Sequence, residues 1–265
     1  MTTEQITVQT TTTPDGIAYD RAGHGGRPVI LVDGLGQMRA VDAGTRALTT
    51  ALAERGFDVV HHDRPGRGDS AGEPPFTLAG EVAALRVLVD ELGGRAALYG
   101  SSSGAAIALA AAAAIPGVDR LVLWEIPLDV DADPGAGWAF HAGIVERAGD
   151  PEAALRAAMG FLPPEVLDGM LAGPDGDRYR RLAPTTAADA EALARALDGL
   201  RDGSLAATVT VPTTLLTGTS TWPFMAAAAD ALAAALPDAR RAEVPGADHA
   251  WEPDDMAAVL ASALG

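Results

Sequence analysis

Short apolar runs alternate along this chain with longer segments whose apolar residues recur at helical spacing. Pro28–Val32 is a β-branched run with the length of a buried strand. In 45–55, Leu48 and Leu52 share one helical face, and Gly56 follows as a C-cap. Applied to the whole chain, this pattern predicts strands at 6–10, 17–20, 28–32, 57–60, 96–99, 120–124, 213–217 and 241–244. It predicts helices at 45–55, 78–92, from 105 onward, at 224–236 and at 254–264.

The alternation stops between residues 128 and 207. That segment contains no strand-like run and breaks into short helical pieces at Gly149-Asp150-Pro151, Pro163-Pro164 and Gly173-Pro174. We expect an α/β fold: a mostly parallel, eight-stranded, twisted sheet with helices on both faces. Residues 1–127 and 208–265 would form this core, and 128–207 a helical cap inserted after the sixth strand, over the crevice at the strand ends.

Composition narrows the function classes. The 265 residues are 48% hydrophobic, enough for one large core, and 36 acidic against 19 basic residues give a net charge of −17. That charge argues against nucleic-acid and anionic-membrane partners. With no cysteine, disulfides and thiolate metal sites are excluded, and we expect no cofactor. The first residues lack a basic patch and an apolar core, so a cytoplasmic protein is expected. The oligomeric state, monomer or homodimer, stays open.

One motif carries candidate chemistry. Gly100-Ser101-Ser102-Ser103-Gly104 lies between the apolar run 96–99 and a stretch of strong helix formers from Ala105. A strand that turns into a helix within one or two residues holds the turn residue in a strained, exposed conformation, and glycines at both flanks allow the two backbones to approach closely. This context favours Ser102 as a nucleophile.

A second G-x-S-x-G sequence, Gly68 to Gly72, makes the motif alone insufficient. Its serine, Ser70, lies well past the preceding apolar run and is followed by Glu73-Pro74-Pro75. Paired prolines disfavour helix entry. We therefore interpret Ser70 as a loop residue.

Taken together, the motifs resemble the α/β-hydrolase family over nearly the whole chain. The resemblance rests on sequences that follow predicted strands: Asp33-Gly34-Leu35-Gly36, Asp63 to Gly68, Gly100 to Gly104, Trp124-Glu125-Ile126-Pro127, Pro212 to Gly218 and Gly246-Ala247-Asp248-His249. It implies a serine nucleophile, an acid, a histidine base and an oxyanion hole of two backbone amides.

Carried over to this chain, the resemblance makes His249 the base, although an isolated histidine is more often a surface loop residue. It makes the amides of Leu35 and Ser103 the oxyanion donors, and Gln37 either a further donor or a surface residue. The family usually has a histidine where this chain has Asp33. Of the other histidines, His61 and His62 alternate at a strand end, so one is expected buried and one exposed, and His24 lies in a turn.

The acid is less clearly marked. The loop after the seventh strand, Gly218 to Pro223, holds no carboxylate, whereas Glu125 ends the sixth strand, the other place that the family uses. A buried carboxylate needs a partner. Pairing with His249 would supply one, and a salt bridge to Arg64 is the alternative. Asp129, Asp131 and Asp133 are further candidates, while Asp248 adjoins His249 and is poorly placed to orient its ring.

The cap should determine specificity, and Trp138, Phe140, His141 and Trp222 are the preferred candidates for an apolar substrate pocket. The leading function is hydrolysis of an ester, thioester or lactone of an apolar small molecule through an acyl-enzyme. Two alternatives stay open: a non-hydrolytic use of the same residues (elimination, C–C cleavage or cyclisation in biosynthesis) and a non-catalytic binding protein of the same fold.

Overall fold

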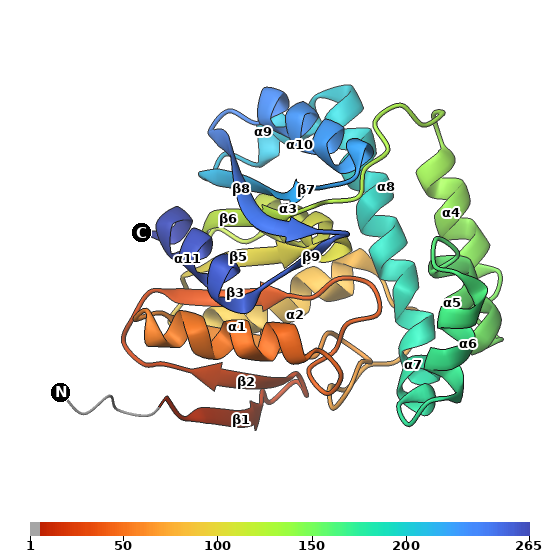
Figure 1. Ribbon diagram of the computed structural model, residues 1–265, viewed down its shortest axis with the longest axis horizontal. Coiled ribbons are helices and arrows are strands. Elements are labelled where there is room, and N and C mark those ends of the chain that lie inside the picture. Colours follow the sequence, from red (N-terminus) through yellow and green to blue (C-terminus); the bar gives the residue numbers. More distant parts are fainter. Residues whose placement is uncertain (1–5) are drawn as a thin grey trace.

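The computed structural model describes residues 6–265, whose strands form one nine-stranded sheet in the order β1-β2-β4-β3-β5-β6-β7-β8-β9 (Figure 1). The bounds are β1 Val8–Thr12, β2 Ala18–Ala22, β3 Pro28–Val32, β4 Asp58–His62, β5 Ala96–Ser101, β6 Val118–Trp124, β7 Thr213–Ser220, β8 Ala239–Ala247 and β9 Ala250–Trp251. The six strands from β4 to β8 in this order are parallel, while β1, β2 and β9 pair antiparallel at the two edges. The carboxyl ends of the parallel strands therefore meet along one edge of the sheet.

Helices cover both faces of the sheet. Helices α1 (Ala43–Glu54) and α11 (Pro253–Leu264) pack together on one face, where Leu48 and Leu260 join a buried cluster with strand residues such as Leu31. On the other face lie α2 (Leu78–Glu91), α3 (Ser103–Ala114) and α10 (Pro223–Ala235), whose apolar residues form a second cluster. The expected α/β architecture is confirmed.

Between β6 and β7 the chain is helical. The helices are α4 Ala136–Val145, α5 Pro151–Ala158, α6 Pro164–Ala172, α7 Gly176–Leu182, the 3-10 turn Ala183–Thr185, α8 Thr186–Asp202 and α9 Ser204–Thr208. Helices α4 to α7, here called the cap, stand together to one side of the sheet (Figure 1) and share their own buried cluster. Helix α8 belongs to both units, because Ala187 and Ala190 pack in the cap cluster whereas Ala192 and Leu197 pack in the core.

The sheet has one strand more than expected. Strand β9 has only two residues and pairs with the end of β8 through Gly246–Trp251 and Ala247–Ala250. Two residues leave no apolar run that sequence periodicity could detect. Within residues 6–265, none of the helices combines the length and the apolar character that crossing a bilayer requires.

Candidate active site

Ser102 lies between β5 and α3, at the turn from strand to helix. Its backbone has φ 56° and ψ −127°, outside the regions that L-residues prefer, and its N–H donates to the carbonyl of Trp124 at 2.9 Å. The flanking glycines are required by space: a Cβ on Gly100 would lie 2.5 Å from the Cα of Ala105, and one on Gly104 would lie 2.3 Å from the carbonyl oxygen of Val32. Strand and helix approach so closely that the turn presents Ser102 outward.

His249 lies at the tip of the β8–β9 hairpin. Asp248 and His249 form its two-residue loop, with φ values of 52° and 64°. Two-residue hairpin loops of the I′ type need positive φ at both positions, and Asp and His are among the residues that tolerate it best. The short β9 therefore fixes the direction in which the His249 imidazole projects.

Glu125 follows β6, and its side chain is directed by two contacts. Oε2 lies 2.6 Å from Nδ1 of His249, and Oε1 accepts the backbone N–H of Gly218 at 2.8 Å. The residue is only 2% exposed. Burial alone would raise the pKa of this carboxyl, but the hydrogen bonds from His249 and Gly218 outweigh it and hold the pKa below its usual value. Glu125 is therefore ionised at neutral pH and faces the imidazole.

Backbone strain is concentrated here. Among residues 6–265, the non-glycine residues with positive φ are Ser102, Glu125, Asp248 and His249. Each such conformation costs on the order of 1–3 kcal/mol and persists only where the surrounding structure imposes it. Three of the four are the residues that sequence reasoning selected for catalysis.

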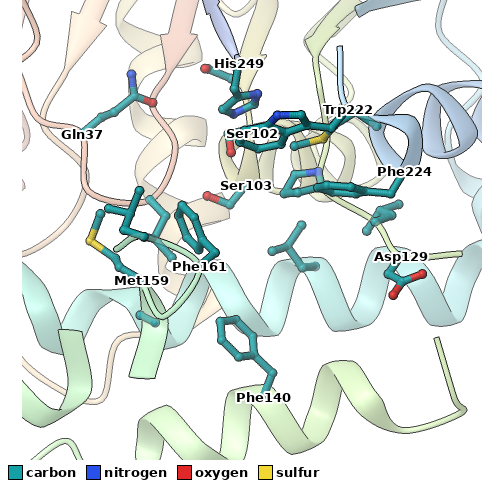
Figure 2. A pocket seen from close by; sticks show the side chains of 18 of the residues that line it. Gln37, Ser102, Ser103, Asp129, Phe140, Met159, Phe161, Trp222, Phe224 and His249 are labelled. Carbon is teal, nitrogen blue, oxygen red and sulfur yellow. The ribbon is translucent and has the colours of Figure 1, made fainter. Parts of the chain in front are cut away.

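Ser102 and His249 face the same cavity, which has a volume of about 870 Å³ (Figure 2). Figure 2 shows the two side chains together at one end, with Phe140 of α4 at the other. Apolar side chains dominate the lining and come from the core and from the cap; among them are Leu35, Pro127, Leu128, Phe140, Met159, Phe161, Leu162, Leu193, Leu197, Trp222, Phe224 and Met225. Such a cavity suits an apolar ligand of small-molecule size.

The four expected pocket residues divide into two pairs. Phe140 and Trp222 line the cavity, and the Trp222 ring lies nearly parallel to the His249 imidazole, with centroids 5.9 Å apart. Trp138 and His141 are not among its described lining residues. The Trp138 indole instead donates to Asp198 at 2.6 Å and meets His141 edge-on. Trp138 thus ties α4 to α8, a role that its helical position alone did not reveal.

The loop after β3 lies beside Ser102. Both Leu35 and Ser103, the expected oxyanion donors, line the cavity, and Ser103 begins α3, where the first amides of a helix lack intrahelical partners. Gln37 braces this loop: its Oε1 accepts the N–H of Gly34 at 2.7 Å, and its Nε2 donates to Asp42 at 2.5 Å. The Gln37 side chain thus holds this loop in place, and it also lines the cavity.

Ser70, the serine of the second G-x-S-x-G sequence, makes only contacts that hold a loop in place. It lies in the loop between β4 and α2, where its Oγ donates to the carbonyl of Asp63 at 2.6 Å and accepts the N–H of Ala18 at 2.8 Å. Its hydroxyl holds the loop against β2, as the flanking prolines indicated.

Arg64, the alternative partner considered for Glu125, is engaged by other carboxylates. Arg64 forms buried ion pairs with Glu81 at 2.8 Å and Asp189 at 2.6 Å. Of the other carboxylates considered, Asp129 is exposed at the cavity lining, and its Oδ1 accepts the N–H of Asp131 at 3.2 Å.

The expectation that one of His61 and His62 is exposed is wrong. Both are buried, because β4 is an inner strand of the sheet with helices on both faces. Nε2 of His61 lies 2.9 Å from the Asp33 carboxylate, and Nδ1 of His62 lies 3.1 Å from the carbonyl of Leu31.

A model of the alpha/beta hydrolase family matches residues 34–263. The chain belongs to this family. An alpha/beta hydrolase from Sphaerobacter thermophilus is 30% identical, with a TM-score of 0.78, and the match covers 97% of this chain and 100% of that one. A hydrolase from Pseudomonas aeruginosa is 26% identical over 97% and 98% of the two chains, with a TM-score of 0.67. An epoxide hydrolase from an endophytic Streptomyces is 23% identical over 98% and 96%, with a TM-score of 0.66, and shows the fold alone.

This α/β-hydrolase departs from the usual family pattern at Asp33. The carboxylate that replaces the usual histidine pairs with His61 from the neighbouring strand β4. Burial alone would lower the pKa of His61, but the negative charge of Asp33 outweighs it and raises that pKa. The Asp33–His61 pair therefore lies at the start of the loop that carries Gly34 and Leu35.

Proposed function

We propose that this α/β-hydrolase is a serine hydrolase that cleaves an ester, thioester or lactone of an apolar small molecule through an acyl-enzyme. The observation that carries the proposal is the 2.6 Å contact between His249 and a buried, ionised Glu125, at the cavity that also exposes Ser102. A carboxylate behind an imidazole, and a serine in front of it, constitute the arrangement that activates a hydroxyl for attack on a carbonyl.

In the first half-reaction, Nε2 of His249 takes the proton of the Ser102 hydroxyl as Oγ bonds to the substrate carbonyl carbon. The carbonyl π electrons move to oxygen, and the amides of Leu35 and Ser103 stabilise the resulting oxyanion. When the tetrahedral intermediate collapses, the bond to the leaving group breaks, and the imidazolium returns its proton to that group. Glu125 holds Nδ1 of the ring, which leaves Nε2 available for Ser102, and it offsets the positive charge that the ring acquires.

In the second half-reaction, His249 removes a proton from water, whose oxygen attacks the acyl carbon. A second oxyanion forms at the same two amides, and Ser102 leaves with the proton that the histidine supplies. The carboxylic acid is released and the free enzyme is regenerated. No further group is needed for these steps.

The cavity supports an uncharged, apolar acyl group. Its lining is mostly aliphatic and aromatic, and it contains the acids Asp42 and Asp129 but no arginine or lysine among the described lining residues. A carboxylate or phosphate on the substrate would meet no countercharge there and would lose its hydration. Esters of short to medium acyl chains or aryl acids are therefore the first substrates to test.

The decisive experiment is labelling with a fluorophosphonate, followed by kinetics with p-nitrophenyl esters. We expect one label per chain at Ser102, a burst of p-nitrophenol that matches the enzyme concentration, and loss of both in Ser102→Ala. The control Ser70→Ala should keep both, since Ser70 makes only loop contacts. Labelling without a burst on any ester would favour the non-hydrolytic alternative, and absence of labelling would favour a binding protein.

A further inference from the structure

A cluster of four buried charges lies beneath the proposed oxyanion hole. Arg64 pairs with Glu81 at 2.8 Å and Asp189 at 2.6 Å, and Arg67 pairs with the other Asp189 oxygen at 2.5 Å. The side chains of Arg64, Arg67 and Asp189 are all 0% exposed. Two positive and two negative charges balance, as burial requires. Asp189 comes from α8, which packs in both the cap and the core, whereas its two arginines follow β4.

Arg67 holds the peptide group that carries one proposed oxyanion donor. Its guanidinium donates to the carbonyl of Gly34 at 2.8 Å. That carbonyl belongs to the same peptide unit as the N–H of Leu35, and in a planar trans peptide the two groups point in opposite directions. The hydrogen bond from the Arg67 guanidinium to the Gly34 carbonyl therefore directs the N–H of Leu35 away from the cluster. It also makes that N–H a stronger donor. Arg64 holds the preceding carbonyl, that of Asp33, at 3.2 Å.

Asp189 also holds the residue that carries the second donor. The Ser103 hydroxyl donates to Oδ1 of Asp189 at 2.7 Å, and Ser103 is 1% exposed. One carboxylate thus contacts Ser103 directly and reaches the Gly34–Leu35 peptide through Arg67. The two halves of the hole come from chain segments nearly 70 residues apart, and Asp189 comes from a third.

We propose that Asp189, with Arg67 and Arg64, is a positioning unit that sets the distance and direction of both oxyanion donors. The inference rests on the proposed function, because it assigns the unit to the acyl-transfer reaction of the same site. Asp189 touches no substrate. It acts through Ser103 and Arg67, and it makes the geometry of the hole depend on how α8 is seated against the core.

The test compares the acylation of an oxygen ester with that of its thiono analogue. Sulfur accepts hydrogen bonds weakly, so a C=S substrate gains less from a well-placed hole than a C=O substrate. In Asp189→Asn, which keeps the shape and removes the charge, the burst rate on p-nitrophenyl butyrate should fall by about 10- to 100-fold, as a misplacement of up to about 1 Å can cause. KM should stay within about twofold, and the thiono ester should lose about fivefold less than the oxygen ester.

If Asp189→Asn does not fold, two further variants still test the inference. Ser103→Ala removes only the hydroxyl that contacts Asp189, and Arg67→Lys keeps the charge but cannot hold Gly34 and Asp189 in the same geometry. Both should show the same selective loss on the oxygen ester, about fivefold for Ser103→Ala and about tenfold or more for Arg67→Lys.

The matched control is Asp58→Asn. Asp58 is another nearly buried carboxylate in a two-bond pair with an arginine, Arg21, but it starts β4 at the opposite end of the strand from the cavity. This variant should lose stability and keep the wild-type ratio of oxygen-ester to thiono-ester rates.

Variants that keep wild-type burst rates, or that lose both ester rates by the same factor, would overturn the inference while the proposed function stands. A wild-type enzyme that neither accepts the fluorophosphonate nor shows a burst would overturn the proposed function itself.

Discussion

Two carboxylate–imidazole pairs lie at the carboxyl edge of the same sheet. Glu125 and His249 are 2.6 Å apart after β6 and β8, and Asp33 and His61 are 2.9 Å apart after β3 and in β4. Their contact geometry is similar, but their access differs: the His249 side chain is 24% exposed at the cavity, whereas that of His61 is 0% exposed. Nδ1 of His61 is buried without a hydrogen-bond partner among the described residues.

The difference shows what the proposed catalytic pair has and the buried pair lacks. An imidazole can pass a proton between nucleophile and leaving group only if its second nitrogen reaches the reaction space. His249 meets this condition because a two-residue loop lifts it off the sheet, while His61 is held within an inner strand. The second pair instead supports the loop that carries Leu35. Exposure of the ring, rather than its contact with a carboxylate, separates the two roles.

The largest expected effect comes from replacing each imidazole in turn. His249→Gln should lower kcat by about 10⁶-fold, since loss of one member of such a unit costs nearly as much as loss of all. His61→Gln should fold less stably but keep kcat within about tenfold, as it has no path to the substrate. Steady-state kinetics on p-nitrophenyl esters measure both. Equal losses in two folded variants would show that the buried pair takes part in proton transfer.

The same comparison can be made with the carboxylates. Glu125→Gln keeps the shape but cannot orient or neutralise the imidazolium, so kcat should fall by about 10⁴-fold with the melting temperature little changed. Asp33→Asn should lower the free energy of unfolding by about 1–3 kcal/mol, because a buried partner of His61 is weakened. Its kcat should stay within about fivefold. Near-wild-type turnover in Glu125→Gln would redirect the search for the acid to Asp129.

The local sequence pattern predicted those residues of the candidate site whose role can be seen from their immediate neighbours in the chain. Ser102 is predictable because strand, glycine pair and helix are adjacent in sequence, and Glu125 because a carboxylate ending an apolar strand demands a partner. Asp189 could not be found this way: it looks like a polar residue early in a helix, and its partners lie more than 80 residues away. Trp138 and His141 are not among the described residues that line the cavity, because a helical period does not tell which face meets the cavity and which meets α8.

A smaller effect concerns stability: the contributions of His61 and His62 to the free energy of unfolding depend on pH in opposite directions. Burial, with the nearby charge of His61, lowers the pKa of His62 to about 3. The unfolded chain takes up this proton near pH 6.5 and the folded protein does not, so His62 stabilises the protein fully above pH 6.5 and progressively less as the pH falls toward 3. The loss could reach about 5 kcal/mol. His61, whose pKa is raised by Asp33, has the opposite sign: its contribution is complete below pH 6.5 and is lost as pH rises through its folded pKa.

Urea unfolding at several pH values between 7.5 and 4 measures this dependence. His62→Asn can still donate to the carbonyl of Leu31 but does not titrate, so its free energy of unfolding should vary less with pH than that of the wild type. A variant with the wild-type dependence would assign the acid sensitivity to other groups, such as Glu125.

The smallest expected effect extends the comparison from the imidazoles to the aromatic residues of α4. Phe140 lines the cavity, whereas Trp138, two residues earlier, is bonded to Asp198 and lies under the Arg195 guanidinium at 5.4 Å. Phe140→Ala removes apolar surface from the acyl site, so kcat/KM should fall about fivefold for octanoyl esters and little for acetyl esters. Trp138→Ala should instead lower the melting temperature and leave the dependence on acyl-chain length unchanged. If Trp138→Ala changed that dependence as strongly as Phe140→Ala, contact with the cavity would not distinguish the two aromatic residues. The packing of α4 against α8 would then determine chain-length selectivity.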